Sequence, residues 1–463
     1  MKDGAIYDVV IVGGGASGTA LLFALTRYTT LSRIALIEKY KEAGSVNTQS
    51  NNNSQTLHIG DIETNYSLEK VKSVAPAAFM IPHYTAMLSA KERARILFPV
   101  HKMVLGIGSE DVAKLEQRYE QIKSVFPKLK KLDREGIANV EPKVMEGRSA
   151  DAPVLALAQW GYAVDFKELA QSFVRQTLAR TDAKERVQVH FNAAVTDVTR
   201  TPDGMWNLIF AGKSITARVV IFDADAYSLT FAKRLGYGKE FSLIPVAGTF
   251  FFSKQILNGK VYTVQEPRLP FAAIHGDPDV RVPNKTRWGP TARFLPVLEA
   301  RNGKTARDYF AVSGLHHFRT WVSFAVILLD PLRFWYLAKN LLYEIPFIGR
   351  YYFAQQARKI VPSLSGADFI RAHGFGGMRL QRVNTNTHEL LLGEGKIVGE
   401  NIIFNMTPSP GASVCLYNAI RDIEHIVRFL NVPDAFDQKR MAKELCDGHM
   451  TLDDPSLKES YAS

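Results

Sequence analysis

A glycine-rich turn between two apolar segments lies within the first forty residues and leaves few possible folds for this chain. Residues 5–12 (AIYDVVIV) form a nearly continuous apolar run, which is typical of a strand buried on both faces of a parallel sheet. The stretch 13–18 (GGGASG) follows directly and fits the pattern G-x-G-x-x-G. A helix is predicted over residues 19–27, and a second strand over residues 33–38 ends in Glu38. This order of elements predicts a Rossmann-like unit that binds a dinucleotide.

Each glycine of the turn has its own role in such a unit. Gly13 permits the tight turn, Gly15 lets the backbone approach a pyrophosphate, and Gly18 lets the helix pack close to the strand. Ala16 and Ser17 stand at the helix N-terminus, where unpaired N–H groups and the positive end of the helix dipole favour phosphate. These five residues are therefore candidate cofactor contacts.

Glu38 restricts the choice of dinucleotide. It lies twenty residues after Gly18, where a carboxylate accepts hydrogen bonds from an adenosine ribose. A carboxylate there disfavours the 2′-phosphate of NADP, whereas FAD and NAD are equally compatible with the motif. The alternative is a glycine-rich turn without a ligand, which the ordered arrangement of strand, glycines, helix and acid disfavours.

Composition excludes several other classes of protein. The 463 residues predict two or three domains and a core that needs no disulfide or structural metal. Only Cys415 and Cys446 are present, which predicts a reducing compartment, and without a C-x-x-C pair or an H-E-x-x-H motif no metal site is expected.

The net charge of +11 favours an anionic membrane or acidic substrates. Nucleic acid is not expected as a partner, since no nucleic-acid-binding signature is present. The opening residues do not resemble a signal peptide, so a cytoplasmic location is predicted.

The polar loop over residues 50–61 (SNNNSQTLHIGD) narrows the choice of cofactor. By composition alone it would be a solvated Asn-rich loop. Its place about twenty residues after Glu38 resembles the flavin-contacting loop of the D-amino-acid-oxidase-like FAD enzymes. Asn53, Ser54, His58 and Gly60 resemble the N-S-G-x-x-H-x-G loop of the L-2-hydroxyglutarate dehydrogenases. The longer string SQTLHIGDIETNY is similar to the malate:quinone oxidoreductases, in particular their shorter form.

The resemblance extends over residues 5–430 and implies further contacts with FAD. Asp225 stands where relatives have glycine in an Ala-Gly-Ala segment, and Leu380 replaces the proline of a G-x-R-P-Q segment beside the flavin. The cofactor contacts that the resemblance implies, beyond the glycine turn and Glu38, are Ser54, Gln55, Thr56, Val195, Gly377, Gly411, Ala412 and Ser413.

The resemblance also implies the fold class and the domain organisation. We expect an α/β protein with a discontinuous Rossmann-like FAD-binding domain and a mixed-sheet substrate domain. The expected segments are 1–80, 150–238 and 366–432 for the FAD-binding domain, 81–149 and 239–365 for the substrate domain, and 433–463 for a polar C-terminal helix and tail.

The implied reaction is oxidation of (S)-malate to oxaloacetate, with FAD passing the electrons to a membrane quinone. A guanidinium can clamp a carboxylate bidentately, and the family position makes Arg379 the candidate, although a single arginine is more often a structural ion pair. His275 and His58 are candidates for the base that takes the hydroxyl proton, since imidazole titrates near neutrality. His275, in the turn IHGDPD, is favoured slightly, and His373 is a weaker candidate.

Residues 318–353 are the most apolar and aromatic part of the chain. Asp330, Pro331 and Arg333 interrupt the run, so a single membrane-spanning helix is not expected. Aromatic side chains beside basic ones suit helices that lie in a membrane interface against anionic headgroups. We therefore expect a peripheral protein on the cytoplasmic face of the membrane, while an internal helical bundle is the alternative.

Other functions remain compatible with the sequence. The same fold could oxidise another 2-hydroxy acid, such as L-2-hydroxyglutarate or lactate, or reduce oxygen as an oxidase. A non-catalytic membrane-associated flavoprotein is a further alternative, which the substitutions at Asp225 and Leu380 leave open.

Overall fold

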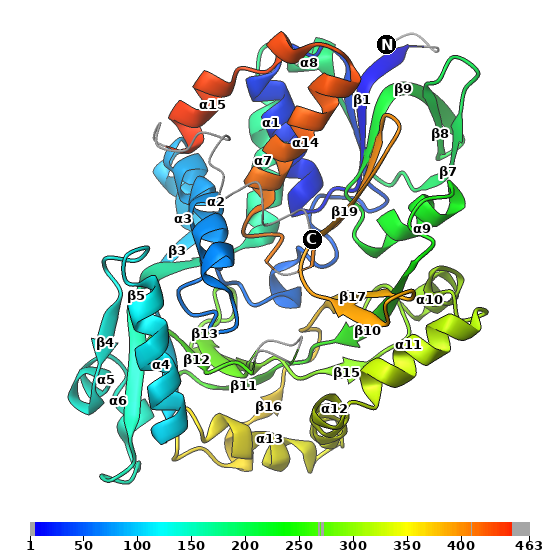
Figure 1. Cartoon of the computed structure of the whole chain (residues 1–463). Helices are drawn as coiled ribbons and strands as arrows, with labels where there is room; N and C mark the ends of the chain where they lie inside the picture. Colours follow the sequence, from blue (N-terminus) through cyan, green and yellow to red (C-terminus); the bar gives the residue numbers. More distant parts are fainter. Residues whose placement is uncertain (1–4, 267–268, 270–272, 409, 447–463) are drawn as a thin grey trace.

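A computed structural model describes residues 5–266, 269, 273–408 and 410–446 of the chain. The chain forms two lobes, one around a mainly parallel sheet and one around two mixed or antiparallel sheets (Figure 1). The expected C-terminal segment 433–463 is therefore described only as far as Cys446.

The first lobe contains the predicted Rossmann-like sheet. Its strands follow the order β19-β20-β9-β1-β2-β6, and β1 is parallel to both β2 and β9. The antiparallel strands β7 and β8 extend it from β9. The strands of this sheet are β1 (Ile6–Val12), β2 (Ile34–Ile37), β6 (Val187–His190), β7 (Val195–Arg200), β8 (Trp206–Phe210), β9 (Lys213–Phe222), β19 (Gly395–Gly399) and β20 (Ile402–Met406).

Strand β1 explains why its sequence is apolar throughout. Val9 and Ile11 belong to the core under helices α1, α7 and α14, whereas Val10 and Val12 belong to the core on the opposite face of the sheet. Both faces of the strand are buried, as predicted. The helices on these two faces are α1 (Ala16–Tyr28), α7 (Phe166–Leu178) and α14 (Cys415–Phe429) on one, and α9 (Ala226–Arg234) on the other.

The second lobe contains the predicted mixed sheet. Strands β12 and β3 are parallel, while the other pairs of this sheet are antiparallel. In order across the sheet, the strands are β16 (Ile370–Arg371), β11 (Phe251–Lys254), β14 (Lys285–Gly289), β13 (His275–Pro278), β12 (Lys260–Thr263), β3 (Leu97–Ile107), β5 (Val154–Val164) and β4 (Lys130–Leu132). A smaller antiparallel sheet joins β15 (Arg293–Phe294), β10 (Phe241–Ala247), β17 (Met378–Asn384) and β18 (Glu389–Leu391).

The remaining helices cover the outside of the two lobes. Helix α15 packs against α2 beside the first lobe, and α11, α12 and α13 lie along the side of the second lobe farthest from the parallel sheet (Figure 1). These helices are α2 (Leu68–Ala86), α3 (Ala90–Ile96), α4 (Ser109–Ile122), α5 (Arg134–Val140), α6 (Pro142–Met145), α8 (Ala183–Arg186), α10 (Ala306–Ser313), α11 (Phe318–Leu328), α12 (Pro331–Tyr343), α13 (Gly349–Ala357) and α15 (Gln438–Leu445).

Two segments of the chain pair with a different lobe from the one expected. Strand β5 pairs with β3 along its whole length, so the second segment of the first lobe begins near Asp165 rather than at residue 150. Strand β17 pairs with β10, so the third segment begins at β19 rather than at residue 366. Helix α15 lies in the expected C-terminal segment, and its Met441 and Leu445 are buried in the core of the first lobe.

Candidate active site between the lobes

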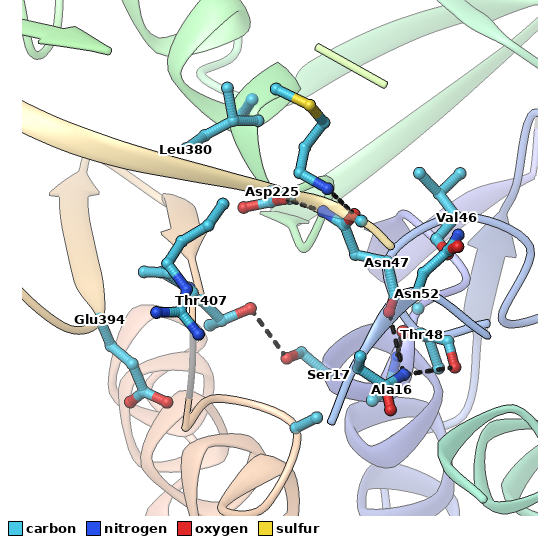
Figure 2. Close-up of a pocket in the computed structure, with 18 of the residues that line it drawn as sticks. Ala16, Ser17, Val46, Asn47, Thr48, Asn52, Asp225, Leu380, Glu394 and Thr407 are labelled. Atoms are coloured by element: carbon cyan, nitrogen blue, oxygen red, sulfur yellow. Dashed lines mark hydrogen bonds between the residues drawn. The ribbon is translucent and has the colours of Figure 1, made fainter. Parts of the chain in front are cut away.

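A cavity of about 1110 Å³ lies between the two lobes and receives side chains from both. The first lobe contributes the glycine turn after β1, the loop after β2, and the loop before α14. The second lobe contributes β10, β12, β13 and β17. Figure 2 shows part of this wall: Ala16 and Ser17 lie near each other, and Leu380 and Glu394 lie apart from them and from one another. The volume is large enough for a dinucleotide with a small substrate beside it.

Two glycines of the turn, Gly13 and Gly18, leave no room for a side chain. A Cβ at Gly13, whose φ is +117°, would lie 2.3 Å from the carbonyl oxygen of Asp223. A Cβ at Gly18 would lie 2.0 Å from the carbonyl oxygen of Gly13, so α1 begins in close contact with the strand. Ser17, at the end of this turn, has its hydroxyl 3.2 Å from the hydroxyl of Thr407, which follows β20 (Figure 2). The backbone and the helix N-terminus therefore face the cavity directly.

Glu38 lies at the end of β2, on the wall of the cavity. Its Oε2 accepts a hydrogen bond from the Gly14 N–H at 2.6 Å, and its Oε1 accepts one from the Tyr40 N–H at 2.8 Å. Burial raises the pKa of this carboxyl above its usual value overall, although the two backbone N–H groups act in the opposite direction. The carboxylate is thus fixed beside the glycine turn.

Most of the predicted cofactor residues meet at this cavity. Gln55 does not line it, because its side-chain amide donates to Asp279 Oδ2 at 3.2 Å and accepts from the Val280 N–H at 3.1 Å in the second lobe. Gly18 and Gly411 lie behind the wall, where a Cβ would collide with neighbouring backbone. The predicted residues that line the cavity are Gly13, Gly15, Ala16, Ser17, Glu38, Ser54, Thr56, Val195, Gly377, Ala412 and Ser413.

The two departures from the family pattern are accommodated. Asp225 adopts the positive φ of +51° that suits glycine, and its Oδ2 accepts a hydrogen bond from the Asn47 side chain at 2.8 Å (Figure 2). Burial raises the pKa of Asp225 to about 6. Leu380 is buried in β17 opposite Pro245 of β10 and lines the cavity. Neither substitution removes backbone pairing at the site.

Arg379 lines the cavity from β17, as the sequence analysis expected. Burial lowers the pKa of its guanidinium, and the nearby hydroxyls of Tyr336, Tyr66 and Tyr262 act in the opposite direction. These three tyrosines were not identified from the sequence, because they come from α12, from the loop before α2 and from β12, and no local spacing links them. The result is a half-buried cation near aromatic hydroxyls.

His58 forms a pair with Glu63, a residue that the sequence analysis missed. The Glu63 carboxylate contacts His58 Nδ1 and also accepts a hydrogen bond from the Gly60 N–H at 2.8 Å. His58 Nε2 lies 3.0 Å from the hydroxyl of Ser54, and all three side chains line the cavity. Burial would raise the pKa of Glu63, but His58 lowers it below its usual value overall. Four residues separate this His and Glu in the string HIGDIE, and such a spacing does not by itself indicate a catalytic pair.

His275 also lines the cavity, but both ring nitrogens are turned toward the protein. Nδ1 lies 3.2 Å from the carbonyl oxygen of Ala273, and the buried Nε2 lies 3.7 Å from Asp277 Oδ1. The ring stacks on Tyr262 with 4.2 Å between centroids. Burial lowers the pKa of His275 to about 3, so the imidazole is neutral. His373 is exposed and does not line the cavity.

Buried cations support the loop that carries Ser54, Thr56 and His58. Lys260 Nζ and Arg287 Nη2 both donate to the Ser54 carbonyl oxygen, at 3.2 and 2.7 Å, and both pair with Asp277. Lys102 Nζ donates to the Leu57 carbonyl oxygen at 3.1 Å and pairs with Asp61 at 2.7 Å. Since these charges are buried and paired, the loop is fixed in position.

This chain resembles known proteins both in sequence and in fold. The malate:quinone oxidoreductase (Mqo) family profile matches residues 5–304. A probable malate:quinone oxidoreductase of Campylobacter jejuni is 38% identical over 450 residues, which cover 95% of this chain and 99% of the relative. A malate:quinone oxidoreductase of Helicobacter pylori is 37% identical over 447 residues, which cover 95% of this chain and 98% of the relative. The structure of a dithionite-reduced L-α-glycerophosphate oxidase from Mycoplasma pneumoniae with FAD bound has the same fold. Its TM-score is 0.60 at 17% identity, with 92% of this chain and 95% of the other covered. On the strength of the profile and of these two relatives, the chain belongs to the malate:quinone oxidoreductase family.

Proposed function

We propose that this chain oxidises (S)-malate to oxaloacetate with FAD in the cavity between the lobes and passes the electrons to a membrane quinone. The observation that carries the proposal is that a dinucleotide cradle, a half-buried arginine and a His–Glu pair line one cavity. The family profile and the named relatives support malate and quinone as the reactants.

The residues present fit FAD. Gly13 and Gly18 have no space for a Cβ, and the N-terminus of α1 faces the cavity. Glu38 contacts Gly14 of the turn, at the position that binds a ribose in this motif. When bound, FAD supplies a hydride acceptor, and the protein supplies position and electrostatics. Gly13, Gly15, Ala16 and Ser17 would hold its pyrophosphate.

Three other side chains of the cavity, those of Arg379, His58 and Glu63, have separate roles toward the substrate. Arg379 binds a malate carboxylate through its planar donor pairs, and burial strengthens that interaction. His58 takes the hydroxyl proton on Nε2, and Glu63 holds the opposite nitrogen. We prefer His58 to His275 as the base, which reverses the preference from the sequence. Glu63 holds Nδ1 of His58 while its side chain is partly exposed, whereas His275 is fully buried and burial lowers its pKa to about 3.

Anaerobic reduction of the flavin tests this assignment. Malate, lactate and L-2-hydroxyglutarate are mixed in parallel with the holoenzyme, and loss of flavin absorbance is followed by stopped flow. We expect rapid bleaching with malate and reoxidation by a soluble quinone. Faster bleaching with another 2-hydroxy acid would replace the substrate, production of hydrogen peroxide in air would identify an oxidase, and no bleaching with any of them would leave a non-catalytic flavoprotein.

We further propose that helices α11–α13 attach the protein to the membrane. In the described part of the chain no single helix has the length and hydropathy of a membrane span, and α11 and α12 pass that test only as a pair bent by 82°. Their outer side chains are exposed: Phe318 by 80%, Trp335 by 70% and Phe347 by 89%. An exposed apolar surface of this kind does not fit the alternative of an internal bundle, and it is typical of an interaction site.

Charge favours a membrane as the occupant of this surface. Arg319, Arg333, Lys339 and Arg350 lie on the same three helices and their connections, beside the aromatic side chains. Basic residues next to interfacial aromatics attract anionic headgroups, and the cytoplasmic leaflet carries such lipids. We therefore place the contact on that leaflet.

A matched pair of variants tests the attachment. Trp335→Glu changes the proposed membrane surface, and Trp160→Glu changes an equally exposed tryptophan (74%) on β5. We expect wild type and Trp160→Glu to float with anionic liposomes at low salt and Trp335→Glu to remain behind. Flotation of Trp335→Glu, or no flotation of wild type, would remove this part of the proposal.

A further inference from the structure

A second cleft, of about 810 Å³, opens at the beginning of α11, away from the cavity between the lobes. It lies between the end of α9, the end of α10 and the turn that joins β17 to β18. Its wall includes Lys233, Lys239, His316, His317 and Arg319. No step of the proposed reaction uses these residues.

The wall of this cleft is strongly basic. Glu240 is the one acidic residue among those that line it. Among the described residues, no carboxylate lies within the 4.0 Å ion-pair distance of Lys239 or Arg319. Lys233 Nζ is held toward the cleft wall by the Val312 carbonyl oxygen at 2.7 Å. Three lysine or arginine side chains and two imidazoles thus face one carboxylate.

The first turn of α11 adds to this imbalance. It contains no acidic residue, and no side chain caps it. Helices generally place acidic groups at this end, because the dipole is positive there. Here Arg319 stands in the first turn, so like charges meet at the cleft. A bound anion would balance them.

The cleft is continuous with the apolar surface of α11. Phe318 belongs to both, since it lines the cleft and is 80% exposed. Trp321, Ala325 and Leu329 follow it at spacings of three, four and four residues and are also exposed, which places them in one stripe along the helix. A ligand that suits the whole arrangement has an anionic head in the cleft and an apolar part along the stripe.

We propose that this cleft binds the phosphate-bearing headgroup of an anionic phospholipid, with the α11 stripe in the adjoining acyl region. This inference rests on the proposed membrane attachment and adds a defined lipid site to it. Lys239 and Arg319 contact the phosphate at the mouth of the cleft, where they are exposed. Binding there fixes the orientation of the protein on the bilayer.

Vesicle binding by charge-reversal variants tests the proposal. Lys239→Glu/Arg319→Glu changes the cleft, and Lys130→Glu/Lys131→Glu changes the net charge equally on exposed β4. Both are assayed as holoenzyme on phosphatidylcholine vesicles with and without phosphatidylglycerol. We expect the cleft variant to bind the anionic vesicles about 30-fold more weakly than wild type, and the β4 variant to bind within about threefold of it. Equal losses in the two variants, or none in either, would overturn the lipid site.

Two further measurements distinguish the proposed lipid site from the proposed reaction and from a site for a soluble anion. Malate oxidation with a soluble quinone should be the same in wild type and the cleft variant, so failure of the reaction and failure of the lipid site are distinguishable. Inorganic phosphate is compared with chloride at equal ionic strength. Replacing chloride by phosphate should shift the melting temperature of wild type no more than it shifts that of the cleft variant. A selective rise would identify a site for a soluble anion and overturn the lipid assignment.

Discussion

The carboxylate of Glu63 contacts Nδ1 of His58, so the proton of the imidazole is held on that nitrogen and Nε2 is left to accept one. This tautomer is the one that a base facing Ser54 and the cavity requires. Glu63 thereby acts as a positioning residue for the proposed base.

Glu63→Gln should lower turnover by about 10²-fold or more while flavin remains bound, because the amide no longer fixes the tautomer of His58. His58→Gln should have a loss at least as large, whereas His275→Gln should retain most of the activity. Rapid-reaction reduction by malate, with the flavin spectrum as the control for cofactor content, measures all three. If His275→Gln is inactive and His58→Gln is not, the two histidines exchange roles.

Arg379→Lys should raise KM for malate by about 10- to 100-fold, since an ammonium cannot reproduce a bidentate contact with a carboxylate. Steady-state kinetics with a soluble quinone measure the change. Arg382→Lys, three residues later on the same strand β17, is the matched control. An unchanged KM in Arg379→Lys would remove the carboxylate clamp from this position.

The sequence predicted the dinucleotide part of this site better than the substrate part, for a physical reason. The glycine turn and Glu38 lie within one β-α-β unit, where local spacing determines geometry. Glu63, Tyr66, Tyr262 and Tyr336 meet only because two lobes close on each other, and no periodic pattern marks such long-range contacts. For His275 the structure adds the complete burial of its side chain, which the motif IHGDPD does not indicate, because burial depends on packing between strands far apart in the sequence.

The domain boundaries illustrate the same limit. Residues 154–164 fall within the segment 150–238 that we expected in the FAD-binding domain, yet β5 pairs with β3 in the other sheet. Strand pairing is a long-range property, and an apolar strand of either sheet has a similar local sequence.

Gly13→Ala should yield a folded but colourless protein, since the added methyl would lie 2.3 Å from the Asp223 carbonyl oxygen at a φ of +117°. The ratio of flavin to protein absorbance after purification measures the loss. Gly108→Ala provides the control, because Gly108 also has a positive φ, of +86°, but its added methyl would meet nothing within 4 Å. Equal flavin content in the two variants would contradict the proposed cradle.

Lys102→Met should destabilise the protein by about 3–5 kcal/mol, because Asp61 would remain buried without its cation. Urea denaturation of the holoenzyme measures the change in the free energy of unfolding. The double variant Lys102→Met/Asp61→Leu removes both charges and should recover most of the loss. A double variant as unstable as the single one would show that packing of the side chain, and not the buried charge, is responsible.

His275 should make the stability of the folded chain depend on pH in mildly acid solution. Burial lowers its pKa from 6.5 to about 3, so between these values the unfolded chain binds a proton that the folded chain does not. Stability from this residue is complete above pH 6.5 and falls as the pH drops, by about 1.4 kcal/mol per unit once the unfolded imidazole is charged. Asp277, Lys260 and Arg287 also face the ring, and their interactions with it are removed together with its proton-binding site in His275→Gln. Urea denaturation from pH 7 to pH 5 should therefore give a shallower decline in His275→Gln than in wild type, whatever the absolute stability of the variant. Parallel declines would mean that the imidazole is charged in the folded protein, and the argument against His275 as the base would lose its electrostatic support.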